Sequence, residues 1–291
     1  MTAVGELYKG RELLWNLTLR ELRGKFKRTA LGWAWSMLNP LSTIVIYSIV
    51  FGKLLKGGEP ELGSPSGLKN FTLWLSVGLL VWNFTNNGIQ ATLPSIVGNS
   101  NLVKKVYFPR EYVVAASVLS WLVTFLIELL VLSVVFLFWP PHHLVFPWIP
   151  GILVIVLLHM MFVLGISLLL SALNVYFRDI QHFVGIGMQI WFYLTPIVYT
   201  TQLVKDRLTP IVLGADKLPL VPEQRAGHFT IFRIFRLNPM MRFVDAYRKL
   251  IYSGALPPLS TMVYLVVVSF LTLFVGWRVF SRLEPRFAEE L

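Results

Sequence analysis

The sequence predicts an all-α membrane protein with six transmembrane helices. Only 14% of its 291 residues are charged and 55% are hydrophobic, whereas a soluble domain has about 25% charged residues. The mean hydropathy is correspondingly high, at +0.65. Too few charged side chains remain to cover a surface that faces water, so lipid must contact much of the protein.

Six apolar runs are long enough to cross a bilayer as helices. A helix rises about 1.5 Å per residue, so a hydrocarbon core of about 30 Å takes about 20 residues. The predicted spans cover residues 31–55, 71–93, 111–139, 148–175, 183–200 and 259–280. The first run lacks a small-residue cleavage site, so it is interpreted as a span and not as a signal peptide.

Lys and Arg residues orient the chain. They gather before the first span, in the second and fourth connections and after the last span. This predicts a multi-pass membrane protein with both termini in the cytoplasm. Residues 201–258 conflict with this orientation, because they are expected outside yet hold nine Lys and Arg residues. We keep six spans, since the charge rule is weak for long loops. The net charge of +11 flanks apolar runs and does not indicate nucleic-acid binding.

Residues 1–30 are predicted to form a cytoplasmic amphipathic helix. An apolar stripe recurs at helical spacing in Trp15, Leu19, Leu22 and Phe26, with Arg20 and Arg23 beside it. Such a helix can lie among lipid headgroups with its apolar side in the membrane. Two interpretations stay open: a basic flank of the first span and nothing more, or an interface helix that also contacts a cytoplasmic partner.

Glu128 and His159 are expected to meet inside the bundle. Glu128 lies ten residues before Phe138 and His159 ten residues after Ile149, so both are at a depth of about 15 Å from the same outer face. An acid inside the membrane is costly and usually finds a partner. The pair is interpreted either as a polar lock between helices or as a proton relay.

Five sequence stretches carry a resemblance to a known family. They are RGKFKRTALGWAWSMLNPL (23–41), NSNLVKKVYFPREY (99–112), NVYFRDIQHF (174–183), FYLTPIVY (192–199) and RLNPMMRFVDAYRKLIYSG (236–254). Each stretch alone is weak, but their order over nearly the whole chain is specific. The sequence resembles the ABC-2-type permeases that export polysaccharides, which are the transmembrane subunits of O-antigen, teichoic acid and galactan ABC transporters.

The resemblance implies a homodimer in the plasma (inner) membrane that works with two copies of a separate nucleotide-binding ATPase subunit and exports a lipid-linked polysaccharide. The chain itself has no G-x-x-x-x-G-K-[ST] motif, which is the loop that cradles nucleotide phosphates. ATP and Mg are therefore expected on the partner subunit, with no cofactor in this chain. No cysteine and no H-E-x-x-H motif is present, so no metal site is expected, and the chain is interpreted as a transport subunit and not an enzyme.

The resemblance also identifies residues 94–110 as a coupling helix that the ATPase moves. The expected contact residues are Asn99, Asn101, Leu102, Lys104 and Lys105, with a second contact at Arg178 and Asp179 on the shortest cytoplasmic turn. Without the resemblance, residues 94–110 read as an ordinary basic loop. Arg178 and Asp179 read equally well as a local ion pair, which is worth little on an exposed turn.

Aromatic and amide side chains indicate a conduit. Sugars present flat C–H faces that stack on aromatic rings, and a sliding polymer needs many weak sites. The expected lining residues are Trp33, Trp35, Tyr47, Trp82, Asn83, Asn86, Asn87, Gln90, Trp191, Tyr193 and Tyr199. The four amide side chains among residues 83–90 share one helical face, and amides are costly in lipid. For each single ring, the alternative is an interfacial anchor of the ordinary kind.

Residues 201–258 are expected to form an extracellular gate before the last span. Similar permeases place short re-entrant helices there, and prolines punctuate the segment. Its Arg residues would then bind phosphates of lipid or substrate outside the cell.

Two other functions stay open. A membrane-embedded glycosyltransferase or polymerase acting on lipid-linked sugars needs neighbouring acids, whereas Asp179 and Asp245 each lack a second acid nearby in the sequence. An ABC-2 exporter of a drug or small lipid would instead have a narrow conduit that is poor in aromatic residues.

Overall fold

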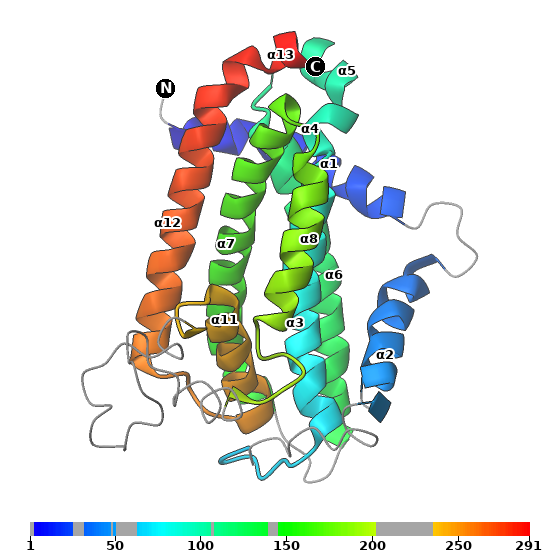
Figure 1. Cartoon of the computed structure of the whole chain (residues 1–291), viewed down its shortest axis with the longest axis vertical. Coiled ribbons are helices and arrows are strands. Elements are labelled where there is room, and N and C mark those ends of the chain that lie inside the picture. The colour runs from blue at the N-terminus through cyan, green and yellow to red at the C-terminus, as the bar shows by residue number, and fades with distance from the viewer. Residues whose placement is uncertain are drawn as a thin grey trace, which may run out of the picture.

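The computed structural model of the chain describes residues 3–25, 32–47, 49–50, 63–105, 108–138, 145–201 and 235–291. Every regular element in these ranges is helical, as the sequence predicted. Figure 1 shows long helices running side by side, with both termini and the short helices α4, α5 and α13 at one end of the bundle and α11 near the other.

The elements follow one another in a simple order. They are α1 (Ala3–Lys25), η1 (Gly32–Ala34), α2 (Trp35–Tyr47), α3 (Phe71–Thr92), α4 (Ser95–Gly98), α5 (Ser100–Lys105), α6 (Glu111–Phe138), η3 (Phe146–Trp148), α7 (Ile149–Tyr176), α8 (Ile180–Tyr193), α11 (Pro239–Tyr247), the π-helical η5 (Arg248–Ser253), α12 (Leu259–Leu283), η6 (Glu284–Arg286) and α13 (Phe287–Glu290).

Within the described residues, three segments are long and apolar enough to cross a membrane: Glu111–Phe138, Phe146–Tyr176 and Leu259–Arg286. They match the third, fourth and sixth predicted spans. Helix α3 begins at the predicted residue and ends one residue before the predicted end of the second span. Part of the first predicted span, including residues 51–55, lies outside the described residues.

The fifth predicted span is wrong at its end. The helix was expected to reach residue 200, but α8 stops at Tyr193. Its 14 residues cover about 21 Å, which is less than the thickness of the hydrocarbon core of a bilayer. Pro196 explains the early end, because a residue that precedes proline disfavours the helical conformation. The Thr195 hydroxyl also donates to the carbonyl of Trp191, at 2.8 Å.

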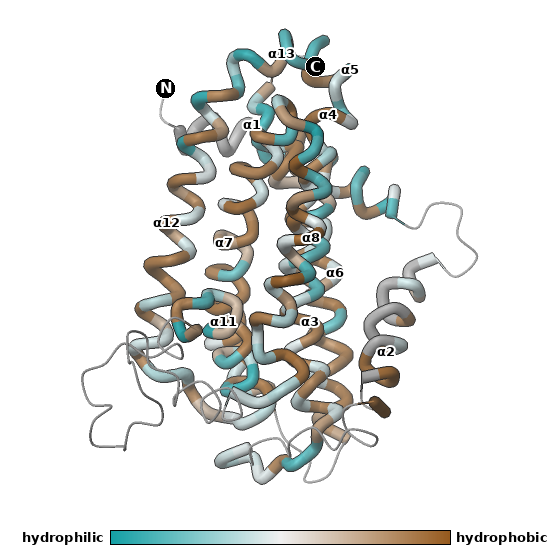
Figure 2. The backbone as a smooth tube through the Cα atoms, in the orientation of Figure 1, coloured by the Kyte–Doolittle hydropathy of each residue, from teal (hydrophilic) through white to brown (hydrophobic). Residues whose placement is uncertain are grey.

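Aromatic rings from four helices fill the centre of the bundle. Phe84 on α3 stacks on Phe125 of α6 with 4.9 Å between ring centroids, and Phe162 on α7 lies 5.3 Å from Phe243 on α11. The outward faces remain apolar, since Leu130 on α6 and Phe274 on α12 are each 62% exposed. Figure 2 shows hydrophobic residues along the long helices. This arrangement suits lipid as the surrounding solvent.

Helices α7 and α12 cross at two glycines. A Cβ atom on Gly276 would collide with the backbone of Gly165, and one on Gly165 would collide with the backbone of Thr272. Small residues let membrane helices approach until their backbones touch. Only glycine therefore permits this crossing.

Candidate functional site

Helix α1 crosses the bundle at the end that holds both termini and packs against α6 (Figure 1). Leu17 is buried and contacts Tyr112 and Ala116, and the Tyr112 ring lies where a Cβ atom on Gly10 would be. Residues 3–25 of the predicted segment are thus helical, but the residues of its apolar stripe differ in burial. Leu22 is buried, whereas Trp15 is 61% exposed.

The remaining residues of the predicted interface helix show its second face. Leu19 is half-buried and Arg20 and Arg23 are exposed, while Phe26 lies outside the described residues. One face of α1 therefore packs on its own chain, and the face that carries Trp15 stays open.

Lys25 is the last residue of α1, and its side chain lies against α6 in a partly buried site. Its ammonium lies 3.5 Å from the ring centroid of Trp121 and 3.4 Å from Oγ1 of Thr124. Burial lowers the pKa of Lys25 to about 7, against the opposing pull of the Glu21 and Glu128 carboxylates. Lys25 is thus an electrostatic partner of Glu128.

The predicted pair of Glu128 and His159 is wrong. His159 is fully buried; its Nε2 lies 2.7 Å from Oγ1 of Thr85 and its ring stacks on Phe243 at 4.5 Å. Glu128 interacts electrostatically with Lys25. Equal depth did not bring the two side chains together, because they face different directions on α6 and α7.

The predicted coupling segment is two short helices with a break at Asn99. Arg20 of α1 donates to Oδ1 of Asn99 at 2.8 Å, and Asn99 donates through Nδ2 to the carbonyl of Ser95 at 2.8 Å. Asn99 therefore ties α1 to the α4–α5 junction. Sequence reasoning identified Asn99 as a contact for a partner but did not foresee this internal role.

The outward surface of this end is polar. Asn101, Lys104 and Lys105 on α5 are exposed, as are Arg178 and Asp179 in the turn between α7 and α8. Leu102 is half-buried and packs against the residues around Leu17. These exposed charged and amide side chains are accessible to a second protein.

The four amides of the expected conduit lie together on one side of α3. Asn83, Asn86, Asn87 and Gln90 are all half-buried. Gln90 lies beside α8, with its Nε2 at 3.9 Å from where a Cβ atom on Gly185 would be. The face of α3 that carries these amides thus contacts α8 in part and remains partly accessible.

The expected aromatic residues differ in their surroundings. Trp82 is only 6% exposed, because Trp191 packs edge-on against it at 6.0 Å. Trp35 and Tyr193 are exposed, while Tyr199 is half-buried and donates its hydroxyl to the carbonyl of Tyr193. The side chains of Trp33 and Tyr47 lie outside the described residues.

Asn238 links α8 to α11 at the opposite end of the bundle. Its Oδ1 accepts from the backbone N–H of Met240 at 3.0 Å, which caps α11, and from Nε1 of Trp191 at 2.9 Å. Its Nδ2 donates to the carbonyl of Leu194 at 3.0 Å. The Asn-Pro pair before an apolar run is a helix-start signal, which could have identified this junction from the sequence.

Arg248 is a second structural residue that the sequence did not reveal. It is 5% exposed and donates to the carbonyls of Pro196 at 2.7 Å and Ile197 at 2.8 Å. Its guanidinium also lies 3.4 Å from the ring centroid of Trp74. One of the nine positive charges that conflicted with the predicted orientation is therefore held inside the protein.

Long apolar helices with exposed apolar faces define a multi-pass membrane protein. Residues 12–208 match the protein family described as ABC-2 type transporter. The match covers more than half of the chain, and the protein therefore belongs to the ABC-2 type transporter family.

Relatives match over nearly the full length. The chain is 30% identical to the O-antigen export system permease protein RfbA of Myxococcus xanthus, over 99% of this chain and 98% of that protein. It is 28% identical to a protein of the same name from Klebsiella pneumoniae, over 96% and 95% of the two chains. The polysialic acid transport protein KpsM of Escherichia coli is 20% identical over 92% of each chain.

Proposed function

We propose that this chain is the permease subunit of an ATP-driven exporter that moves a lipid-linked polysaccharide out of the cytoplasm. The near-full-length similarity to permeases named for O-antigen export carries the proposal. Similarity to a protein named for polysialic acid transport supports a polymer as substrate. ATP and its Mg would bind to a separate ATPase subunit, with two copies of each chain in the assembly.

The end that holds both termini is the proposed docking site for the ATPase. It presents Asn101, Lys104, Lys105, Arg178 and Asp179 to solvent. A surface of exposed Lys and Arg residues steers and positions an acidic partner more than it tightens binding. This end would lie in the cytoplasm of a cell whose plasma membrane contains the remaining helices, in accord with the positive-inside rule.

The polar face of α3 is the proposed path for the polymer. Its half-buried amides supply both donors and acceptors to sugar hydroxyls. The exposed rings of Trp35 on α2 and Tyr193 on α8 would stack on sugar faces. Many weak contacts of this kind hold a polymer without stopping it.

A charge-reversal experiment tests the proposal. The variant Lys104→Glu/Lys105→Glu/Arg178→Glu should lose a co-purifying ATPase in mild detergent and should leave the lipid-linked polysaccharide inside the cell. Arg282→Glu, which changes an exposed charge on α12, is the control and should retain both. The proposal fails if the wild-type chain purifies without any ATPase, or if deleting its gene leaves surface polysaccharide unchanged.

A further inference from the structure

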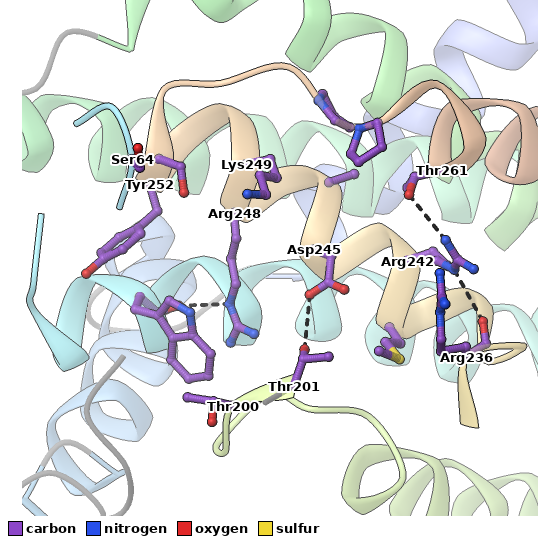
Figure 3. A pocket seen from close by; sticks show the side chains of 16 residues that line it. Ser64, Thr200, Thr201, Arg236, Arg242, Asp245, Arg248, Lys249, Tyr252 and Thr261 are labelled. Carbon is purple, nitrogen blue, oxygen red and sulfur yellow. Dashed lines mark hydrogen bonds between the residues drawn. The ribbon is translucent and has the colours of Figure 1, made fainter. Parts of the chain in front are cut away.

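A cavity of about 410 Å³ is lined by residues of α11, which lies near the end of the bundle opposite the termini (Figure 1). It lies between α11, η5 and the start of α12, with residues 200–201 on its other side (Figure 3). Its size falls in the range of small-molecule sites. It would hold on the order of ten water molecules, so it exceeds the space that one phosphate group needs.

The cavity is strongly positive. Among the described residues, Arg236, Arg242, Arg248 and Lys249 line it together with one acid, Asp245, which gives these lining residues a formal charge of 4 − 1 = +3. Asp245 accepts a hydrogen bond from Oγ1 of Thr201 at 3.5 Å, as Figure 3 shows. A concave site with one sign of charge attracts an ion of the other sign.

Arg242 is held in place by neutral groups. Its Nη1 donates to Oγ1 of Thr261 at 3.3 Å and its Nε donates to the carbonyl of Arg236 at 3.2 Å. The guanidinium lies 5.2 Å from the ring centroid of Tyr264. These contacts fix the planar fork, and such a fork matches a carboxylate or a phosphate with two parallel hydrogen bonds.

Hydroxyl groups complete the wall. Thr200, Thr201, Thr261 and Ser64 line the cavity beside the cations. Hydroxyls and guanidinium groups together suit a ligand that carries both an oxyanion and alcohol groups. A sugar with a phosphate or carboxylate substituent has this chemistry.

We propose that this cavity binds an oxyanion-bearing saccharide, with Arg242 as the residue that grips the oxyanion. On the exit side of the exporter it would engage a charged group of the glycan as the polymer leaves, which rests on the proposed function. Arg248 supplies a fixed positive charge from the cavity floor, and Arg236 and Lys249 add charge at its rim.

Calorimetry on the purified chain in phosphatidylcholine nanodiscs tests the site. Glucose 6-phosphate should bind saturably, inorganic phosphate should bind at least tenfold more weakly, and glucose should give no saturable heat. Arg242→Gln should weaken glucose 6-phosphate binding at least tenfold, and Arg242→Lys should retain part of it. Arg282→Gln removes an exposed charge outside the cavity and should bind as the wild type does.

Four results would overturn the proposal. The first three are no saturable binding of glucose 6-phosphate at millimolar concentrations, binding of inorganic phosphate as tight as that of glucose 6-phosphate, and binding to Arg242→Gln as tight as to the wild type. The fourth is loss of glucose 6-phosphate binding in nanodiscs that contain phosphatidylglycerol, which would assign the cavity to a lipid headgroup. A melting curve verifies that Arg242→Gln is folded. The assay needs no ATPase, so intact binding with failed export would refute only the proposed function, and failed binding with intact export only this site.

Discussion

At the residue scale, Arg248 shows how a cation is accommodated inside a bundle that faces lipid. Its partners are the carbonyls of Pro196 and Ile197 and the ring of Trp74. Both carbonyls are free of helix hydrogen bonding because α8 ends at Tyr193. A buried charge is tolerable when hydrogen bonds replace its hydration, so Arg248 joins three segments that are distant in the sequence.

Replacing Arg248 by Met should destabilise the protein. The carbonyls of Pro196 and Ile197 would lose their donor, and a buried acceptor without a partner costs about 1–3 kcal/mol. We expect the melting temperature in detergent, followed by tryptophan fluorescence, to fall by roughly 5 °C or more. The neighbouring exposed residue Lys249 provides the control, and an equal loss in Lys249→Met would contradict the assignment.

At the element scale, the crossing of α7 and α12 depends on two glycines. Gly165 and Gly276 bring the two backbones into contact, and there is no space for a side chain at either position. Packing at such a crossing is a main source of attraction between membrane helices, because lipid removes the hydrophobic driving force.

Gly165→Leu should therefore separate α7 from α12. We expect the variant to yield little monodisperse protein in gel filtration and to melt well below the wild type, since overpacking costs about 1–3 kcal/mol or more. Gly187→Leu on α8 is the matched control, because nothing lies within 4 Å of a Cβ atom there. A normal profile for Gly165→Leu would show that the helices can part without loss.

Docking of α1 should depend on pH through Lys25. Burial lowers the pKa of Lys25 from 10.5 to about 7, so the undocked state binds more protons between these values. Docking of α1 should therefore strengthen as pH rises from about 7 towards 10.5. Below pH 7, docking should be weakest, and the titration of Lys25 should add no further pH dependence. Hydrogen exchange of α1, corrected for the intrinsic rate, measures this effect.

Lys25→Met is the control for the pH effect. It removes the titrating group while keeping an apolar stem against Trp121, so the pH dependence of α1 protection should disappear in this range. If the dependence persists in the variant, another group is responsible.

At the scale of the whole molecule, polarity is divided among three places. The end with both termini presents exposed charges, the opposite end holds the cationic cavity, and the amides of α3 lie between them. The proposed export path would pass the amides of α3 on its way from the charged end to the cavity.

The variant Asn86→Leu/Asn87→Leu tests the path. It should reduce surface polysaccharide at least tenfold, because the polymer loses hydrogen-bonding partners, while ATPase binding stays normal. Asn86→Gln/Asn87→Gln keeps the amide chemistry and should retain most export. If the Leu and Gln variants export equally well, the amides of α3 do not contact the substrate.

The sequence by itself determined that lipid surrounds much of this protein and where several of its long helices lie. Apolar runs of bilayer length predicted the three spans that the structure supports by length and composition, and α3 nearly residue by residue, because hydropathy and helical rise are local properties. Basic and polar residues likewise indicated the end where charges gather, and ordered motifs indicated the ABC-2 type transporter family to which the chain belongs.

Only the tertiary structure decided which side chains meet. The depth of Glu128 and His159 could be counted along the chain, but their partners Lys25 and Thr85 come from α1 and α3, and the direction in which each side chain faces depends on how the helices pack. The positive charge of Arg248 conflicted with the orientation expected from the sequence. In the fold, the carbonyls of residues 196–197 accept hydrogen bonds from it. Long-range packing provides such partners, and no local pattern encodes it.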